Sequence, residues 1–326
     1  MLEHGGNLAL AAKQYNIPLE NWLDLSTGIN PNAYPIPPIA PDVWQRLPLD
    51  DDGLIAAACA YYDSPFALPT AGSQAALQVL PAMRAPCKVA ILSPMYNEHA
   101  HAWQRAGHQV ITFAGYPDER TLNTADVLLV CNPNNPTAAQ FSAVNLLAWH
   151  ATLAKRGGWL VVDEAFGDAN PEQSIAQHTY LEGLIVLRSL GKFFGLAGAR
   201  VGFLLANQAL LNSAQELIGP WSLTGPSRFI AKQALLDTQW QQLARLQLAA
   251  SSQRMAQLLT QYGLRPAASN ALFQYVPTQN AQLVQQQLAQ QGVWVRYFSE
   301  HTALRFGLPA ETAWNKFESA LSLLKI

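Results

Sequence analysis

Short apolar segments alternate with segments of helical periodicity through the middle of the chain. Apolar runs of strand length fall at residues 89–92, 110–113, 127–131, 159–163, 184–187 and 201–205. Apolar residues recur at helical spacing at residues 53–62, 73–83, 97–106 and 143–156. Continuous apolar strands separated by helices are typical of a parallel sheet that is covered on both faces. The pattern therefore predicts a three-layer αβα domain around a mainly parallel sheet.

The two ends of the chain differ from this middle part. Towards the C-terminus we expect helices at 226–236, 239–262, 281–291 and 310–324 and strands at 273–276, 293–297 and 303–306. Near the N-terminus we expect a helix at 8–15 and a strand at 22–25. The Asn- and Pro-rich run that follows, 30–38, cannot continue either element. These patterns predict an N-terminal arm (1–40), a large domain (41–230) and a small C-terminal α/β domain (231–326).

Composition removes several classes of protein. Apolar residues make up 50% of the chain and charged residues 13%, which is enough for a sizeable core. A formal net charge of −2, without a Lys- and Arg-rich run, argues against binding to nucleic acid or an anionic membrane. No run approaches ~18 apolar residues and no secretory signal is visible, so we expect a cytoplasmic protein without a membrane span. The three cysteines are far apart, which predicts reduced, half-buried thiols and no disulfide or zinc site.

A lysine among glycine and aromatic residues is the first candidate for chemistry. Lys192 lies in the segment SLGKFFGLAGAR, directly after an apolar strand, and a desolvated lysine can form a Schiff base with an aldehyde. Ser189 and Arg200 flank it and suit a phosphate group. The ordinary alternative is a solvated lysine in a surface loop. A Ser-x-x-Lys pair of the penicillin-binding type needs Ser-Asp-Asn and Lys-Thr-Gly motifs, which the chain lacks.

An aspartate at a strand end is the second candidate. Asp163 ends the apolar run in VVDEAF, where sites in open α/β sheets collect. It can pair with the protonated ring nitrogen of pyridoxal 5′-phosphate (PLP) and keep that ring an electron sink. The alternatives are a helix N-cap and a Mg²⁺ ligand of the Walker B kind. The chain has no Gly-x-x-x-x-Gly-Lys-[Ser/Thr] motif to accompany the latter.

Two further segments are weak signals by themselves. The segment TAGSQAA (70–76) opens a predicted helix, whose N–H groups either bind phosphate or form an ordinary N-terminal cap. The segment NPNNPT (132–137) follows a strand and alone indicates only a turn. In chain order, however, the four segments form one pattern. That pattern resembles the fold-type I PLP enzymes of the aspartate aminotransferase superfamily, over nearly the whole chain.

The resemblance implies a role for each of these residues. Lys192 would be the Schiff-base lysine and the proton shuttle, and Asp163 would pair with the ring nitrogen. Asn135 would hydrogen-bond the cofactor 3′-oxygen, and Tyr96 would stack on the ring unless it is plain core. The cofactor phosphate would be held by Gly72, Ser73, Gln74, Ser189 and Arg200. No metal is implied.

Two arginines are candidates for binding the anionic groups of a substrate. Arg305 interrupts the apolar run 303–306, and a buried arginine needs an anionic partner. The resemblance implies that Arg305 binds the substrate carboxylate, and Arg296 is a second candidate for an anion. A structural ion pair is the alternative for both.

The N-terminal arm narrows the resemblance. The start HGGN and the segment LDLSTGINP (23–31) resemble the L-threonine-O-3-phosphate decarboxylases of cobalamin biosynthesis, with histidinol-phosphate aminotransferases as the next relatives. The implied substrate is a small phosphorylated amino acid, bound in part by His4, Gly5, Gly28 and Asn30. A frayed terminus is the alternative for His4. The implied product is (R)-1-aminopropan-2-yl phosphate. Transamination of a phosphorylated amino substrate and a non-enzymatic binding role are the alternatives.

Two positions depart from the family's pattern. Phe166 stands where relatives often have a tyrosine on the 3′-oxygen, which leaves that contact to Asn135. Leu47 stands where many relatives have a tyrosine that reaches the partner subunit's cofactor phosphate. The resemblance still implies a homodimer, but it does not imply that contact.

Overall fold

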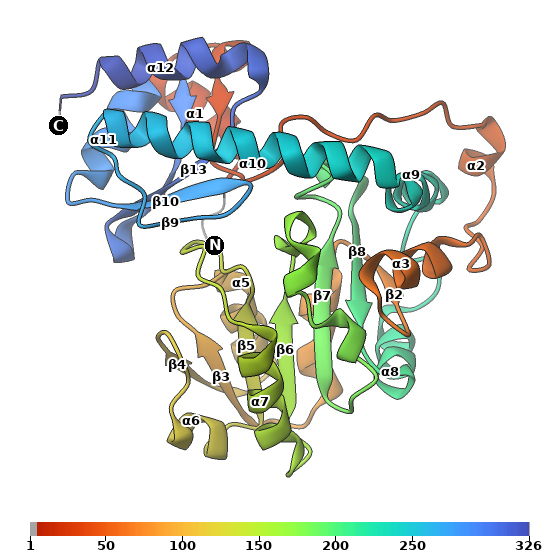
Figure 1. Cartoon of the computed structure of the whole chain (residues 1–326). Coiled ribbons are helices and arrows are strands. Elements are labelled where there is room, and N and C mark those ends of the chain that lie inside the picture. Colours follow the sequence, from red (N-terminus) through yellow and green to blue (C-terminus); the bar gives the residue numbers. More distant parts are fainter. Residues whose placement is uncertain (1–4, 326) are drawn as a thin grey trace. The chain divides into compact units, whose positions relative to one another are not determined.

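The chain forms two compact units in a computed structural model that describes residues 5–325. The larger unit contains residues 34–135 and 139–241, and the smaller unit contains residues up to 33, 136–138 and from 242 onwards. Figure 1 colours the chain by sequence, so that the larger unit runs from orange to cyan-green. No described helix is long and apolar enough to cross a membrane.

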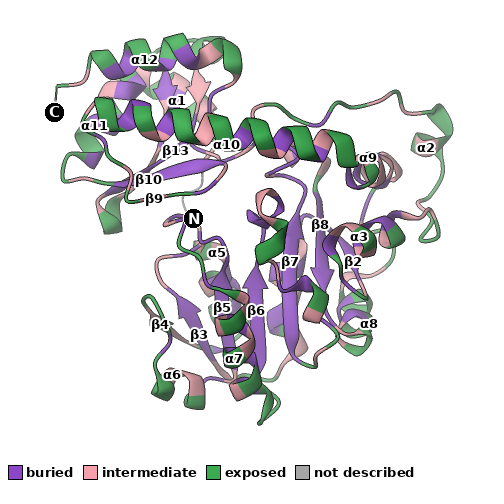
Figure 2. Ribbon diagram, viewed as in Figure 1, coloured by how far each residue is buried: buried purple, intermediate pink, exposed green. Residues whose placement is uncertain are grey.

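A seven-stranded sheet forms the centre of the larger unit. Its strands are β2 (Leu68–Ala71), β3 (Lys88–Leu92), β4 (Gln109–Phe113), β5 (Val127–Cys131), β6 (Trp159–Asp163), β7 (Leu184–Ser189) and β8 (Val201–Leu205). They are ordered β2-β8-β7-β6-β5-β3-β4, and β8 alone runs in the direction opposite to the other six strands. Every residue of β5, β6, β7 and β8 is buried, as Figure 2 shows in purple. The predicted mainly parallel α/β fold is therefore confirmed.

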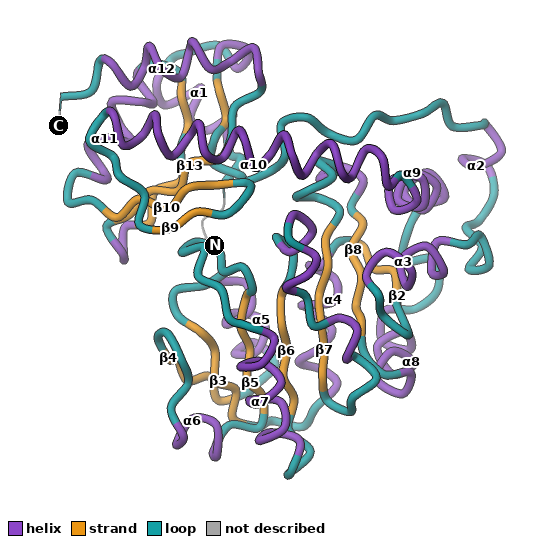
Figure 3. The backbone as a smooth tube through the Cα atoms, viewed as in Figure 1, coloured by secondary structure: helices purple, strands orange, loops and turns teal. Residues whose placement is uncertain are grey.

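Helices cover both faces of this sheet. In Figure 3, α7 lies in front of the strands, whereas α4 and α5 lie behind them. The helices of the unit are α2 (Pro41–Gln45), α3 (Leu54–Tyr62), α4 (Ser73–Val79), α5 (Asn97–Arg105), α6 (Glu119–Thr124), α7 (Ala143–Ala154), α8 (Gln208–Ile218) and α9 (Gly225–Leu236). This arrangement gives the three layers that the apolar pattern predicts.

Strand register places three chain segments at one edge of the sheet. Asp163 lies beside Cys131 on β5 and beside Leu187 on β7. Because β5, β6 and β7 are parallel, their carboxyl ends meet at the same edge, and each strand continues there into a loop (Figure 3). This is the edge at which open α/β sheets form their sites.

The smaller unit combines antiparallel and parallel pairs of strands. β9 (Ala268–Ser269), β10 (Phe273–Pro277), β12 (Arg296–Phe298) and β13 (Ala303–Gly307) form an antiparallel sheet in the order β12-β13-β10-β9. β1 (Leu23–Asp24) pairs in parallel with β11 (Val293–Trp294), so that the N-terminal segment joins the C-terminal one. The helices are α1 (Leu8–Tyr15), α11 (Ala281–Gln290), α12 (Trp314–Ser322) and most of α10 (Thr238–Gln261).

Several predicted elements differ in their bounds. The predicted strand 293–297 is two strands, because Val295 interrupts it, and the predicted helix 310–324 is α12 preceded by a 3₁₀ turn. The elements β2, α2, α6, α8 and β9 have no counterpart among the predictions. Pro69 lies within β2, and a proline is tolerated there because β2 is an edge strand.

Candidate active site

Asp163 is held in a fixed orientation at the carboxyl end of β6. Its side chain is buried, and Oδ2 lies 2.8 Å from Nε2 of His99, in the first turn of α5. Oδ1 accepts a hydrogen bond of 3.0 Å from the backbone N–H of Ala165. Both carboxylate oxygens are therefore engaged, and the imidazole donates when the carboxylate is ionised.

A buried thiol completes the surroundings of this carboxylate. Cys131 faces Asp163 across the strands, and burial, followed by the charge of Asp163, raises the pKa of the thiol well above its usual value. The prediction of a half-buried thiol holds for Cys59 and Cys87 but is wrong for Cys131, because β5 is covered on both faces. The ligand atoms of His99, Cys131 and Asp163 lie within 4.8 Å of one another, although two of them are already hydrogen-bonded together.

Lys192 lies in the loop after β7, the strand next to β6. Its Nζ atom is 5.3 Å from the centroid of the Phe166 ring, and Phe166 lies in the loop after β6. The lysine is half-buried, whereas Phe193 and Phe194 beside it are fully buried. The amine is therefore presented from a rigid apolar segment against an aromatic face.

Gly72 and Arg200 are packed in a way that only a glycine allows. Gly72 has φ 73° and ψ 163°, and a Cβ atom there would lie 2.5 Å from Nη2 of Arg200. Arg200 adopts a left-handed conformation, and its Nη1 donates to the carbonyl oxygen of Ala197. The guanidinium therefore lies directly over the backbone that leads into Ser73. This combination of a bare backbone and an exposed guanidinium suits a phosphate group.

A second glycine, Gly202, allows an equally close approach of two backbone segments. A Cβ atom on Gly202, in β8, would lie 2.3 Å from the backbone N of Ser73 and 2.6 Å from the carbonyl carbon of Gly72. Ser189, on the neighbouring strand β7, pairs in register with Gly202, and its Oγ accepts from the N–H of Gly191. The predicted phosphate residues therefore occur around one close contact between β8 and the start of α4.

Tyr96 and Gln74 form a short hydrogen-bonded chain. The Tyr96 hydroxyl donates to Oε1 of Gln74 at 3.3 Å, and Nε2 of Gln74 donates to Glu98 at 3.1 Å. Burial, together with the nearby charges of Glu98 and Asp163, raises the pKa of Tyr96 to about 12. Tyr96 is therefore neutral at physiological pH, and its ring is held edge-on to His99, with the centroids 6.0 Å apart.

The loop after β5 is fixed by its own side chains. Asn132 exchanges two hydrogen bonds with the backbone of Phe141, and Asn134 donates to the carbonyl oxygen of Pro94. These contacts hold the turn in which Asn135 lies, half-buried, one strand away from Asp163. The segment 132–137, whose sequence alone indicated only a turn, is thus an ordered part of this edge of the sheet.

The smaller unit holds a separate group of predicted residues. Arg305 is 5% exposed, on β13, and pairs in register with Arg296 on β12. Burial, followed by the charge of Arg296, lowers the pKa of Arg305 to about 10, and Asp24 opposes this shift. Arg305 also donates to the carbonyl oxygen of Ser26. Two guanidinium groups held this close favour binding of an anion.

The N-terminal segment packs against Ser26, whose carbonyl oxygen accepts from Arg305. The N–H of Gly6 donates to Oγ of Ser26, and a Cβ atom on Gly5 would lie 2.5 Å from the carbonyl oxygen of Ser26. Gly28 has φ 62°, and Asn30 is buried, with its Oδ1 accepting from the N–H of Asn32. His4 lies outside the described residues.

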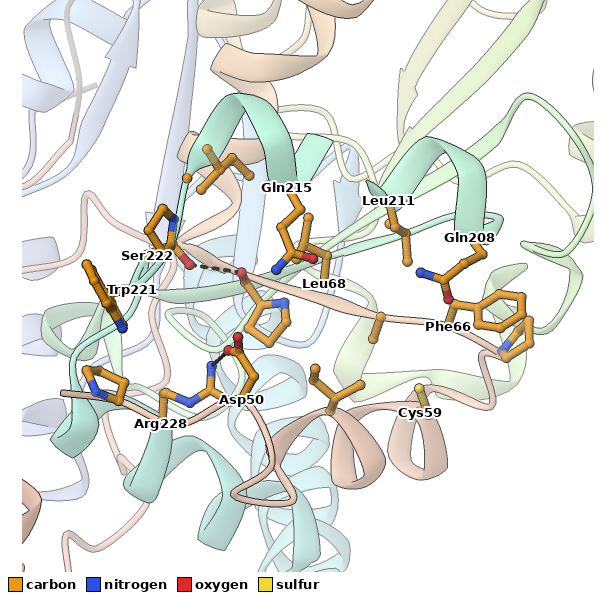
Figure 4. A pocket seen from close by; sticks show the side chains of 18 residues that line it. Asp50, Cys59, Phe66, Leu68, Gln208, Leu211, Gln215, Trp221, Ser222 and Arg228 are labelled. Atoms are coloured by element: carbon orange, nitrogen blue, oxygen red, sulfur yellow. Dashed lines mark hydrogen bonds and ion pairs between the residues drawn. The ribbon is translucent and has the colours of Figure 1, made fainter. Parts of the chain in front are cut away.

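A cavity of about 270 Å³ in the larger unit contains none of the predicted site residues. Figure 4 shows it between the segment around Phe66 and the helices that carry Gln215 and Arg228. The Ser222 hydroxyl donates to the carbonyl oxygen of Pro69, and Arg228 is already paired with Asp52 and Asp50. The charges in this cavity are therefore satisfied within the chain.

Comparison with known proteins decides the family. The family model for class I and II aminotransferases matches residues 60–322. The chain belongs to this family. A threonine-phosphate decarboxylase of Pseudomonas aeruginosa is 52% identical over 322 residues, which cover 98% of this chain and 97% of that protein. A second threonine-phosphate decarboxylase, from a Sinorhizobium species, is 40% identical over 96% of this chain.

Other members of the class I and II aminotransferase family match less of the sequence or only the fold. A histidinol-phosphate aminotransferase of Legionella pneumophila is 38% identical, but over only 35% of this chain. The structure of histidinol-phosphate aminotransferase from Sinorhizobium meliloti, in complex with PLP, has a TM-score of 0.82 and 19% identity over 98% of this chain and 94% of that one. L-threonine-O-3-phosphate decarboxylase from Porphyromonas gingivalis has a TM-score of 0.77 and 18% identity, over 91% and 98%. These structures confirm the fold of the aminotransferase family.

Two residues of this arrangement have no counterpart among the predictions. His99 contacts Asp163 from 64 residues away, and a histidine within a helical pattern carries no signal that it faces a strand end. Gly202 lies inside a strand, where an isolated glycine indicates a close backbone approach. The sequence therefore indicated that some backbone approaches Gly202 closely. It did not indicate that this backbone is the start of α4.

Proposed function

We propose that the protein is a PLP-dependent decarboxylase that converts L-threonine O-3-phosphate to (R)-1-aminopropan-2-yl phosphate and CO₂ in cobalamin biosynthesis. The observation that carries this proposal is the 52% identity, over nearly the full length of both chains, to a threonine-phosphate decarboxylase. Histidinol-phosphate aminotransferases match with 38% identity over 35% of the chain or with 30% identity over 56% of it. The threonine-phosphate decarboxylases match nearly the whole chain at higher identity, which favours decarboxylation over transamination.

The residues at the sheet edge fit PLP as the cofactor. Lys192 would hold its aldehyde as a Schiff base, Asp163 would pair with its ring nitrogen, and Asn135 would hydrogen-bond its 3′-oxygen. Its ring would lie against Tyr96, and its phosphate would be held by Gly72, Ser73, Gln74, Ser189 and Arg200. The fit rests on the contact of Gly72 with Arg200, which leaves the backbone bare where a phosphate would lie. When bound, PLP supplies a sink for the electrons released at the substrate α-carbon.

The side chains of the chain itself supply charge, orientation and a proton. His99 and the N–H of Ala165 fix the orientation of the Asp163 carboxylate, so its charge would remain directed at the ring nitrogen of PLP. The Lys192 amine lies against the Phe166 ring, and in the proposed reaction it would carry the proton to the α-carbon. Burial raises the pKa of Tyr96 to about 12, so its ring is uncharged at physiological pH.

The arginine pair and the N-terminal segment would bind the substrate. L-threonine O-3-phosphate carries a carboxylate and a phosphate, and the repulsion between Arg296 and Arg305 is relieved by an anion beside them. Gly5, Gly28 and Asn30 would contribute backbone and amide contacts, together with His4. Because binding contacts decide which bond to the α-carbon is broken, these residues would also determine the reaction type.

Product analysis tests the proposed reaction. Purified holoenzyme is incubated with L-threonine O-3-phosphate, with and without 2-oxoglutarate, and CO₂ and the organic product are measured. We expect CO₂ and one aminopropanyl phosphate in equal amounts, independent of 2-oxoglutarate. Loss of the amine that depends on 2-oxoglutarate, from this substrate or from histidinol phosphate, would show a transaminase instead.

Replacement of Gly72 by alanine tests the phosphate part of the site. A side chain at φ 73° and ψ 163°, within 2.5 Å of Arg200, should destabilise the fold by about 1–3 kcal/mol and also weaken PLP binding. Gly107→Ala is the matched control, because Gly107 has φ 86° but nothing within 4 Å of an added Cβ atom. We expect a lower Tm for both variants and a higher Kd for PLP only for Gly72→Ala. An unchanged Kd in Gly72→Ala would remove Gly72 from the site.

We further propose a cytoplasmic homodimer. Trp44, Leu47 and Leu49 are each about two-thirds exposed within one short segment, and large apolar side chains exposed so near one another in the sequence favour association. Sedimentation should give twice the mass of one chain, and charged residues at these three positions should give the monomer. Cell fractionation would test the location.

A further inference from the structure

A second cluster of charged side chains lies behind the carboxyl ends of β6 and β7. Arg188 is 1% exposed, and its Nη1 donates to Oε2 of Glu164 at 2.6 Å. Its Nη2 donates to Oδ1 of Asp168 at 2.7 Å. The guanidinium carbon also lies 4.5 Å from the centroid of the buried Tyr62 ring. One cation thus joins two carboxylates where water is excluded.

Strand geometry puts this cluster on the opposite face of the sheet from the proposed cofactor residues. Glu164 follows Asp163 directly, and Arg188 precedes Ser189 directly. Successive side chains in a strand point to opposite faces. The register pairs Asp163 with Leu187, so Glu164 and Arg188 face each other on the far side. The cluster therefore connects the two strand ends without occupying the site.

The same cluster fixes the loop that follows β6. Oε1 of Glu164 accepts from the N–H of Ile175, and Oε2 accepts from the Ser174 hydroxyl at 2.5 Å. A Cβ atom on Gly167 would lie 3.0 Å from Nη1 of Arg188, so the loop packs closely against the guanidinium. Phe166, whose ring faces Lys192, precedes Gly167 in this loop.

We propose that Arg188 is a positioning residue, which sets the separation of Asp163 and Lys192 by tying the end of β6 to the end of β7. The inference rests on the proposed function, in which these two side chains hold opposite ends of one PLP ring. A guanidinium binds two carboxylates at once in a rigid planar geometry, whereas a lysine ammonium is a point charge on a flexible chain. Replacement by lysine keeps the charge and loses the geometry.

Arg188→Lys is compared with Arg228→Lys as the matched control. Arg228 is 4% exposed and also binds a carboxylate with two nitrogens, to Asp52 at 2.7 and 2.9 Å, but it lies on α9 and not at a strand end. Three quantities are measured on each full-length protein: Tm, the Kd for PLP by titration of apoprotein, and the pH midpoint of the visible absorbance of bound PLP. We expect both variants to lose stability. Only Arg188→Lys should raise the Kd for PLP, about tenfold or more, and move the midpoint.

The outcomes separate positioning from general stability. Equal changes in Kd and pH midpoint in the two variants would overturn the role of Arg188 as a positioning residue. If Arg188→Lys does not fold, the same comparison is made with Glu164→Gln and Asp52→Asn, with the same expectation for the first of them. A wild-type protein that binds no PLP would overturn the proposed function and this inference together, and it is recognised before any variant is measured.

Discussion

Lys192→Ala is expected to lower the rate of CO₂ release from L-threonine O-3-phosphate by about 10³-fold or more. Without the amine there is neither a Schiff base nor a group that carries a proton to the α-carbon, and each of these losses is large. The Schiff-base absorbance at ~420 nm should disappear, although Asp163 and the phosphate residues still allow noncovalent binding of PLP. Stopped-flow measurement of product formation and an absorbance spectrum check both expectations.

Lys155→Ala provides the control for this variant. Lys155 is exposed at the end of α7 and outside the proposed site, so activity and spectrum should not change. Added methylamine should restore part of the activity of Lys192→Ala, because a small free amine can replace the missing group. Full activity in Lys192→Ala would contradict the assignment of the Schiff base to this residue.

Asp163→Asn is expected to reduce the turnover number by about 10²–10³-fold, with little change in stability. Asparagine has the same size, and its carbonyl oxygen can still accept from the N–H of Ala165, but it carries no charge to hold a proton on the ring nitrogen. The measurement is kcat with L-threonine O-3-phosphate, together with the visible spectrum of bound PLP. A lower kcat with unchanged Tm would locate the effect in the chemistry.

Asp118→Asn is the matched control for that variant. Asp118 caps α6 by accepting from the N–H of Thr121, and asparagine caps a helix equally well. Its kcat and Tm should equal those of the wild type. An equal fall of kcat in both variants, or an unchanged kcat in Asp163→Asn, would mean that the carboxylate at position 163 does not act on the cofactor ring.

The sequence by itself determined the strands that form the centre of the sheet and the class of chemistry. The runs at β5, β6 and β8 have the predicted bounds, because a strand buried on both faces needs an uninterrupted apolar run. The chain order of the segments 70–76 and 132–137, of Asp163 and of Lys192 with Arg200 likewise resembled a PLP enzyme before any contact was known. Each run and each segment is recognised from neighbouring residues, so neither signal requires knowledge of a long-range contact.

Only the tertiary structure decided which distant residues meet. His99 pairs with Asp163 across 64 residues, Gly202 lies beneath Ser73, and Arg188 faces Glu164 because β6 and β7 are adjacent in that register. A one-residue change of register would turn each of these strand side chains to the other face. Hydrophobic periodicity shows that a strand is buried, but it carries no information on its neighbour. The partners of the site residues therefore depend on packing between segments that are far apart in the chain.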